Sequence, residues 1–471
     1  MELLVLARTY YWALFTKNRF NPKGLWEIWE QLKFLLVFFV SGLVFGIKCK
    51  VVNHKRITHT SAGGRNVLMI SYYSPPYKSM YGTQRLQKFI HYLTREKWNI
   101  TLLTTQPDHS SEQDIESESL PPATEIVRMK KREFCVLSGK TMMVPDDFVP
   151  WVLPAVKEAR TILRQKRIDL IYASAPPYSN LLVGALCSMR YGIPLVSDFR
   201  DPWSKIDGFW RLWHPFLQKL TAVLEARVLQ VSSKIIMVVD SKYHELYFAN
   251  SGAALKNKTV SIKNGFDEED FNEIRNLVNA ERSTQFVASY VGVIYNDETF
   301  SSLTKPFHFW LKRYPADAKS VTFEYAGPNS DYFKKHTRLP FRFVDHGYVS
   351  HKRAIAIRAS SHVQMFSLPS LFSPWVMTGK IYEMIRSDAP ILAMTHPEGA
   401  VADLIRETKT GFVVGPKDYA SAAAILKQCY DKWRHGTANA VSSNRTAVMR
   451  YSRESLSKKL AEVFELAIIG V

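Results

Sequence analysis

The sequence predicts an α/β protein built from two doubly wound domains and a helical N-terminal extension. The chain has 471 residues, which is more than one ordinary hydrophobic core holds, so two domains are expected. Apolar runs of strand length alternate with helical stretches, a pattern typical of parallel sheets covered by helices on both faces. A polar stretch at residues 272–284 interrupts this alternation, which then begins again, so the pattern occurs twice along the chain.

The composition narrows the class of protein and its partners. Hydrophobic residues make up 46% and charged residues 22%, as in globular proteins. The net charge of +19 predicts anionic partners. The charge is spread along the chain and no zinc-finger, RNP or helix-turn-helix pattern occurs, which favours a membrane surface or phosphorylated substrates over nucleic acid. The four cysteines lie far apart, so we expect no disulfide framework, no zinc site and a reducing compartment.

Residues 1–62 form an extension that differs from the rest of the chain. Residues 34–47 are uncharged and mostly apolar, with basic residues on both sides. The run is shorter than the roughly 20 residues that a spanning helix needs, and it lies too far from the N-terminus for a signal peptide. We therefore expect a re-entrant or interfacial helix on anionic lipid. A spanning helix, and a helix buried on the body of the protein, remain alternatives.

Two Rossmann-like domains, at residues 63–275 and 276–450, are expected to face a cleft, and residues 451–471 to form a helix that packs back on the first domain. Buried strands are predicted at residues 67–71, 98–104, 170–173, 194–197 and 235–239, and then at 286–293, 321–326, 362–366 and 391–394. In such sheets ligands bind at the carboxyl ends of the strands. The loops that follow strands are therefore the places to look for chemistry.

In the first domain, several such loops carry polar or conformationally permissive residues. The candidates for the acceptor side of the cleft are Gly82, Arg85, Ser174, Arg200 and Trp203. Asp198 and Asp201 add two carboxylates at one strand end, where they could orient a hydroxyl, stabilise positive charge or act as a base. For residues 198–203 the alternative is an internal ion-pair turn. For the loop with Gly82 and Arg85 it is an ordinary proline-rich turn. Residues 209–216 interleave aromatic and basic groups, which suits a lipid interface or a buried aromatic cluster.

In the second domain, glycine-containing loops offer backbone amides to a nucleotide and its phosphates. The candidates are Gly292, Gly327, Tyr348 and Val349. The sharpest pattern is the segment with Gly379, Lys380 and Glu383. Thr378 is the expected N-cap of a helix, so that Lys380 would meet a diphosphate and Glu383, one turn later, would bind ribose. The alternative is an ordinary capping box made by Thr378 and Glu383.

Taken in order, these loops resemble the retaining family-4 glycosyltransferases of the GT-B fold, particularly bacterial enzymes of surface polysaccharide assembly. The resemblance covers about residues 66–460. The residues that carry it are 70–76, Arg85, 145–147, Trp151, 169–177, 198–203, Glu225, 264–267, Gly292, 347–349, 379–383 and 390–392.

The resemblance implies a nucleotide-diphosphate sugar donor held by the second domain, retention at the anomeric carbon, and neither a metal nor another cofactor. In this family two glutamates contact the donor, and Glu383 matches the second, whereas Trp375 occupies the position of the first. The basic residue usual after Gly292 is also missing, so the phosphate charge falls to Lys380, Arg85 or loop amides. Since the family's catalytic-region histidine has no match, Asp198, Asp201 and Lys380 are the catalytic candidates.

We therefore expect a hexosyltransferase that uses a UDP- or GDP-sugar and a lipid-linked or other saccharide acceptor in polysaccharide biosynthesis. Its expected place is the cytoplasmic side of the bacterial inner membrane, as a peripheral or monotopic protein on an anionic surface, with no nucleic-acid partner. Trp375 leaves open a catalytically degenerate scaffold that binds a partner or a lipid-linked sugar. A nucleotide-sugar epimerase on the same fold is the third alternative.

Overall fold

The computed structural model describes residues 65–76, 83–107, 120–130, 144–205, 215–247, 253–280, 284–335, 339–437 and 441–470. The predicted extension at residues 1–62, Gly82 and most of the aromatic and basic segment at 209–216 lie outside these residues. None of the helices in the described ranges is both long enough and apolar enough to cross a bilayer.

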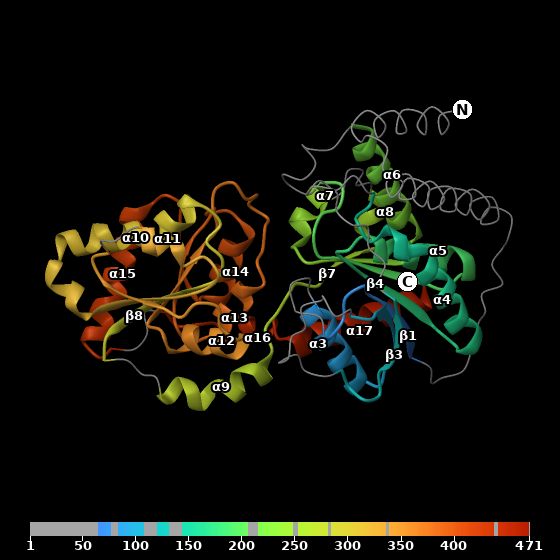
Figure 1. The fold of residues 1–471 in the computed structure, drawn as a ribbon, viewed down its shortest axis with the longest axis horizontal. Helices are drawn as coiled ribbons and strands as arrows, with labels where there is room; N and C mark the ends of the chain where they lie inside the picture. Colours follow the sequence, from blue (N-terminus) through green and yellow to red (C-terminus); the bar gives the residue numbers. More distant parts are fainter. Residues whose placement is uncertain are drawn as a thin grey trace. The chain divides into compact units, whose positions relative to one another are not determined.

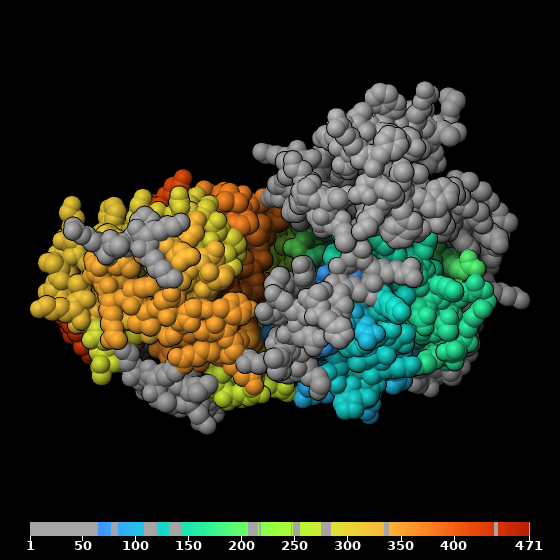
Figure 2. Space-filling view, in the orientation of Figure 1, coloured from blue at the N-terminus to red at the C-terminus, as the bar shows by residue number. Residues whose placement is uncertain are grey.

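The chain divides into two compact units (Figure 1). The first comprises Met1–Ile262 with Ser457–Val471, and the second comprises Lys263–Leu456. Figure 2 draws their surfaces, with the first unit mainly blue to green and the second mainly yellow to orange. The polar stretch that we predicted to separate the domains is wrong as a linker, because most of it belongs to helix α9 (Glu268–Ala280). The division between the units falls before this helix.

The first unit contains a seven-stranded parallel sheet with the order β3-β2-β1-β4-β5-β6-β7. Its strands are β1 (Asn66–Ile70), β2 (Asn99–Thr105), β3 (Glu125–Met129), β4 (Leu170–Ala175), β5 (Leu195–Phe199), β6 (Lys234–Met237) and β7 (Thr259–Ser261). Its helices are α3 (Thr83–Arg95), α4 (Val152–Gln165), α5 (Ser179–Tyr191), α6 (Pro215–Val231), α7 (His244–Tyr247) and α8 (Ala253–Lys256). The edge strands β3 and β7 were not predicted, because they are partly exposed and lack a continuous apolar run.

The second unit contains a six-stranded parallel sheet with the order β10-β9-β8-β11-β12-β13. Its strands are β8 (Phe286–Val291), β9 (Val321–Ala326), β10 (Arg342–Asp345), β11 (Val363–Ser367), β12 (Ile391–Met394) and β13 (Gly411–Val414). Besides α9, its helices are α10 (Asp297–Arg313), α11 (Asp331–Lys335), α12 (His351–Ser360), α13 (Lys380–Arg386), α14 (Ala400–Thr408), α15 (Tyr419–Arg434) and α16 (Arg445–Met449).

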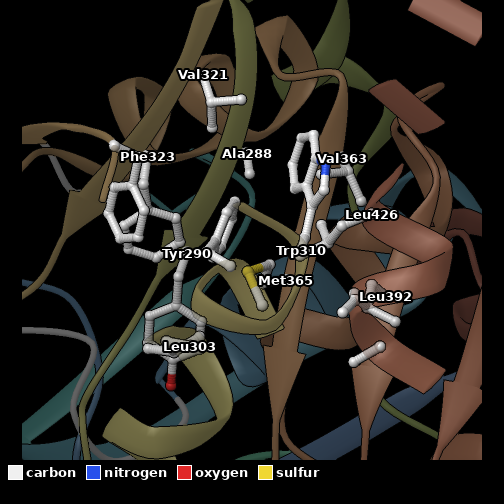
Figure 3. Packing of buried hydrophobic residues seen from close by; sticks show 14 of the residues in the cluster. Ala288, Tyr290, Leu303, Trp310, Val321, Phe323, Val363, Met365, Leu392 and Leu426 are labelled. Atoms are coloured by element: carbon white, nitrogen blue, oxygen red, sulfur yellow. The ribbon is translucent and has the colours of Figure 1, made fainter. Parts of the chain in front are cut away.

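Apolar side chains on both faces of the second sheet explain why helices cover it on both sides. One face packs against α10 and α15 through a cluster that includes Tyr290, Trp310, Phe323 and Leu426 (Figure 3). The other face packs against α12, α13 and α14 in a separate cluster. Strands that are buried on both faces read as mostly apolar runs, which is why β8 and β12 were predictable.

The direction of winding reverses once in each sheet, and this reversal positions the ligand-binding loops. In the second sheet the chain moves outward from β8 to β10, then returns to β11 beside β8 and moves outward the other way. Such a switch point opens a crevice outside the carboxyl ends of the two central strands. In this unit the loops that follow these two strands are residues 292–296 after β8 and residues 368–379 after β11.

The last helix, α17 (Arg453–Ile469), begins among residues of the second unit and belongs to the first unit from Ser457 onward. Its Phe464 ring lies 5.2 Å from that of Trp98, so this part packs on the first unit's core. Near the first and last residues of the second unit, Phe266 forms a bridge with Ser452. A Cβ on Gly265 would lie 2.2 Å from the carbonyl oxygen of Tyr451, so only glycine permits this close approach.

Candidate functional site

Lys380, the first residue of α13, lies at the switch point of the second sheet. Its Nζ atom donates a hydrogen bond to the Tyr290 hydroxyl at 3.1 Å. The same amine lies 4.3 Å from the centre of the Tyr290 ring and 5.2 Å from that of Phe366. Tyr290 is on β8 and Phe366 on β11, so the two central strands of the sheet hold the lysine between their aromatic side chains.

Gly292 completes the surroundings of this amine. Its φ is +145°, a conformation that residues with a side chain rarely adopt. A Cβ at this position would also lie 2.9 Å from the Lys380 Nζ atom. Glycine is therefore required twice, by the backbone turn and by the lysine that occupies the adjacent space. The two residues were predicted separately as donor-binding, and the structure brings them together.

The charge of Lys380 is not neutralised by an acid. Within the part of the chain that the structure describes, no carboxylate pairs with its amine, whose polar partner is the Tyr290 hydroxyl. Burial among the two rings, together with the positive charge of Arg358, lowers the pKa of Lys380 to about 7. A half-buried cation that is placed in a crevice beside a second cation and has no counter-ion forms a site for an anion.

Glu383 is engaged by basic groups from α12. Its Oε2 atom accepts a hydrogen bond from Nη1 of the buried Arg358, and its Oε1 atom lies 3.7 Å from Nε2 of His351. His351 in turn lies 3.4 Å from Oδ2 of Asp270 on α9. Burial lowers the pKa of His351, but the combined effect of the Glu383 and Asp270 carboxylates, which raise it, is larger. The net change in this pKa is upward. Glu383 is thus held by the basic groups of α12, about one helical turn beyond Lys380.

The predicted capping of α13 is wrong. The N-cap residue is Gly379, without a side-chain hydrogen bond, and Glu383 pairs with Arg358 instead of forming a capping box. The Thr378 hydroxyl oxygen is buried and has no hydrogen-bond partner among the described residues. Helix α13 has only seven residues, so the Lys380 side chain is the charged group at this end of it.

The loop that contains Trp375 is fixed at several points. Its Ser370 donates both a backbone and a side-chain hydrogen bond to the Glu298 carboxylate, at 2.9 and 2.8 Å. The carbonyl oxygen of Pro374 accepts a hydrogen bond from the backbone N–H of Ala400 at 2.8 Å. Trp375 therefore belongs to a loop that is tied to both α10 and α14. It occupies the position where the resemblance led us to expect a glutamate.

Two further predicted loops adjoin this crevice. The Gly327 N–H donates to the Gly347 carbonyl at 2.8 Å, and a Cβ on Gly327 would lie 2.3 Å from the Gly292 carbonyl oxygen. Tyr348 is 75% exposed, whereas Val349 packs against Val291 and its neighbours. The loops after β8, β9 and β10 thus lie against one another, and Tyr348 presents its ring to solvent.

In the first unit, Asp198 and Arg85 pair with each other. Their side chains are 0% and 3% exposed, and Arg85 Nε lies 3.1 Å from Asp198 Oδ2. The same oxygen accepts hydrogen bonds from the Tyr172 hydroxyl at 2.6 Å and the Ser174 hydroxyl at 3.2 Å. Arg85 also donates to the carbonyl oxygen of Ile262 at 2.9 Å. These predicted cleft residues form a buried ion pair with each other, which differs from the ion-pair turn within residues 198–203 that was the alternative, because the partner of Asp198 lies on α3.

The residues that follow Asp198 are arranged differently. Arg200 donates to the carbonyl oxygens of Ala175 and Pro176, at 3.0 and 2.8 Å, and so binds β5 to the loop after β4. Trp203 is buried and stacks on Tyr178 with ring centres 5.0 Å apart. Asp201 is exposed, so of the two predicted carboxylates it is the one that a solvent-borne molecule can reach.

Sequence reasoning missed the groups that surround the predicted donor residues: Tyr290, Phe366, Arg358, His351 as a charged partner, and Asp270. Tyr290 and Phe366 appear in the sequence only as apolar members of strands, and Arg358 as one basic residue of a helix. Their shared position follows from strand order, which the sequence does not state. The described residues contain no group of acidic, His or Cys side chains arranged to hold a metal ion.

No family model matches the chain. No curated protein matches it either. Solved structures do: the sucrose-phosphate synthase of Thermosynechococcus elongatus is 12% identical, with a TM-score of 0.62 over 86% of this chain and 100% of that one. A glycosyltransferase from Rickettsia africae is 13% identical, with a TM-score of 0.58 over 86% of this chain and 99% of that one.

The HepE protein of Anabaena, solved in complex with UDP, is 16% identical, with a TM-score of 0.53 over 85% of this chain and 99% of that one. At these identities the likeness establishes architecture and leaves activity open. The two parallel α/β units described above therefore have the fold of the GT-B glycosyltransferases.

Proposed function

We propose that the protein is a glycosyltransferase that binds a nucleotide-diphosphate sugar in its second unit and transfers the sugar to an acceptor. The single observation that carries this proposal is Lys380, a cation without a carboxylate partner at the switch point of a doubly wound sheet. Structures of similar fold carry names that specify glycosyltransfer, and two of them were solved with UDP or a UDP-sugar. A UDP-sugar is therefore the donor we favour, and a GDP-sugar is the other candidate.

Each donor residue has a distinct task in this proposal. Lys380 holds the diphosphate, and the bare Cα of Gly292 lets the phosphate approach the lysine, while the Gly292 N–H donates to the Ala326 carbonyl at 2.9 Å. Glu383 accepts hydrogen bonds from the ribose hydroxyls, while Arg358 fixes its orientation. The exposed Tyr348 ring offers a stacking surface to the base, and the loops at Gly327 and Val349 border it.

The reaction proposed is displacement of the diphosphate by an acceptor hydroxyl, with retention at the anomeric carbon. The bond between the sugar and the diphosphate breaks, the bond to the acceptor oxygen forms, and the departing diphosphate takes the acceptor's proton. Lys380 stabilises the negative charge that develops on the departing group. Asp201, which is exposed, is our candidate for contacting the acceptor, and Asp198 acts by holding the surrounding strand ends.

The finer assignments are also proposals. We place the chain in family 4, without a metal requirement, with a lipid-linked saccharide as acceptor in polysaccharide synthesis. Residues 1–62, with their uncharged run and basic flanks, would attach the protein to the cytoplasmic face of the inner membrane as a peripheral or monotopic protein.

Binding of nucleotide sugars tests the donor assignment. Isothermal titration with UDP-glucose, UDP-N-acetylglucosamine and GDP-mannose should show saturable binding of at least one of them. Lys380→Ala should weaken that binding and lower turnover roughly 100-fold, because one charged donor to the diphosphate is lost. Lys427→Ala is a matched control, since this lysine pairs with Asp431 on α15 and is not part of the site. Equal affinity in the wild type and the Lys380 variant would contradict the proposal.

Trp375 supports a second candidate, a scaffold that binds a nucleotide or lipid-linked sugar without catalysis. It stands in the loop after β11 where a donor-contacting carboxylate would be expected from the resemblance. Release of UDP or GDP from a donor and acceptor panel distinguishes the two. Tight nucleotide binding without any release over a broad panel would favour the scaffold.

A further inference from the structure

We propose that binding of the donor diphosphate draws a proton onto Lys380, and that Tyr290 is the positioning residue that holds the amine ready to receive it. The inference rests on the proposed function and deepens it. In the free protein the anion-binding amine of Lys380 is partly unprotonated, and the Tyr290 side chain governs its protonation.

The environment of the Lys380 amine disfavours its charged form. The Nζ atom contacts two aromatic rings, at 4.3 and 5.2 Å from their centres, and the space on its remaining side is kept open by Gly292. One hydroxyl, that of Tyr290, accepts a hydrogen bond from it at 3.1 Å. An ammonium group has three donors, so a single neutral acceptor leaves the charged form poorly solvated.

The charges around this amine also disfavour its protonation. Arg358 on α12 contributes positive charge, which opposes protonation of the lysine. Glu383, on the same helix as Lys380, has its two carboxylate oxygens directed to Arg358 and His351. From β8, β11 and the loop after β8, the neighbours are Tyr290, Phe366 and Gly292, which carry no charge. No described carboxylate therefore compensates a proton on Lys380.

A bound diphosphate would reverse this preference. Its negative charge would supply the missing counter-ion and additional acceptors, so the ammonium form becomes the favoured one once the anion is bound. Since the pKa of Lys380 in the free protein is about 7, much of the population is neutral under mildly alkaline conditions. The proton is taken from the solvent, and by linkage the affinity for the diphosphate falls as the pH rises.

Tyr290 has a specific part in this equilibrium. Its hydroxyl donates to the carbonyl oxygen of Val293 at 2.7 Å, so its lone pairs are directed to the lysine. It therefore stabilises the charged amine selectively and fixes its position against Gly292. Tyr325 is a matched comparison: its ring is nearly parallel to that of Tyr290 at 6.3 Å, but its hydroxyl accepts from the backbone N–H of Asn329.

The test is calorimetric titration of the full-length protein with UDP-glucose in buffers of different ionisation enthalpy at pH 7.5. The diphosphate of this ligand does not titrate in that range, so proton uptake reports on the protein. With a pKa near 7 in the free state, we expect uptake of roughly three-quarters of a proton per nucleotide bound. Binding with no uptake overturns the inference, whereas the absence of binding by any nucleotide sugar overturns the proposed function instead.

Three variants assign the proton to its residue. Lys380→Arg, which stays charged, should bind without proton uptake and with an affinity that no longer falls between pH 6.5 and 8.5. Tyr290→Phe keeps the ring and removes the acceptor, so the decline in affinity should shift to lower pH. Tyr325→Phe removes the hydroxyl of an equally buried residue and should leave the pH of the decline unchanged. Persistence of the uptake in Lys380→Arg, or equal shifts in the two tyrosine variants, would contradict the assignment.

Discussion

Two cations in the first turns of helices, the buried Arg85 of α3 in the first unit and the half-buried Lys380 of α13 in the second, have opposite surroundings. Arg85 meets the Asp198 carboxylate, and that carboxylate is also hydrogen-bonded by Tyr172. Lys380 meets aromatic rings and one hydroxyl. Both were candidates for binding an anion. The comparison shows that a cation whose charge is already matched inside the protein stabilises the fold, whereas an unmatched cation is available to a ligand.

The largest expected effect comes from breaking the matched pair. Asp198→Ala leaves the Arg85 guanidinium buried without its carboxylate, so the free energy of unfolding should fall by about 3–5 kcal/mol. Urea unfolding followed by circular dichroism measures this loss. Asp201→Ala, at an exposed carboxylate three residues away, is the control and should change the stability by less than about 0.5 kcal/mol. Similar losses in both variants would show that the ion pair is not what distinguishes them.

A smaller effect is expected from filling the space beside the unmatched cation. Gly292→Ala places a Cβ 2.9 Å from the Lys380 Nζ atom and forces alanine into a φ of +145°. The strain should cost about 1–3 kcal/mol, and displacement of the amine should raise the KM for the donor sugar. Gly436→Ala, where φ is also positive but nothing lies near the added atom, controls for the backbone term. An unchanged KM in Gly292→Ala would separate this glycine from the donor site.

The smallest effect concerns His351, whose surroundings are intermediate between those of Arg85 and Lys380. It faces carboxylates, as Arg85 does, but it is partly exposed. Its pKa in the folded protein is raised by Glu383 and Asp270 in spite of burial. Its contribution to stability is therefore fully present below about pH 6.5, the value for an unfolded chain, and is lost as the pH rises through the folded-state value. Thermal unfolding between pH 5.5 and 8.5 should show a decline of less than about 1 kcal/mol that His351→Gln removes. A decline of the same size in the variant would assign it to other groups.

The contrast also explains which parts of the structure could be predicted. The central strands were predictable because burial on both faces makes β4, β8 and β12 continuous apolar runs. Edge strands such as β10 are exposed or only partly buried and carry charged residues, so they were not recognised.

For the site, Gly292 and Lys380 could be singled out individually because glycine and lysine after a strand suit a phosphate. The sequence does not state that β11 returns to lie beside β8, and this strand order is what puts Tyr290 and Phe366 around the same amine. It also does not reveal that Asp198 and Arg85, 113 residues apart, satisfy each other. Long-range pairing decides which charges remain available, and a local pattern carries no information about it.

The bridge between Phe266 and Ser452 brings together the two points at which the chain enters and leaves the second unit. The chain enters the unit beside Phe266 and leaves it beside Ser452, and the backbone N–H of Arg453 donates to the Phe266 carbonyl at 2.8 Å. The unit is thus an insert whose two ends touch, placed within a chain that returns to complete the first core with α17. Such an insert can be excised, circularised or exchanged for a homologous module without moving its termini apart.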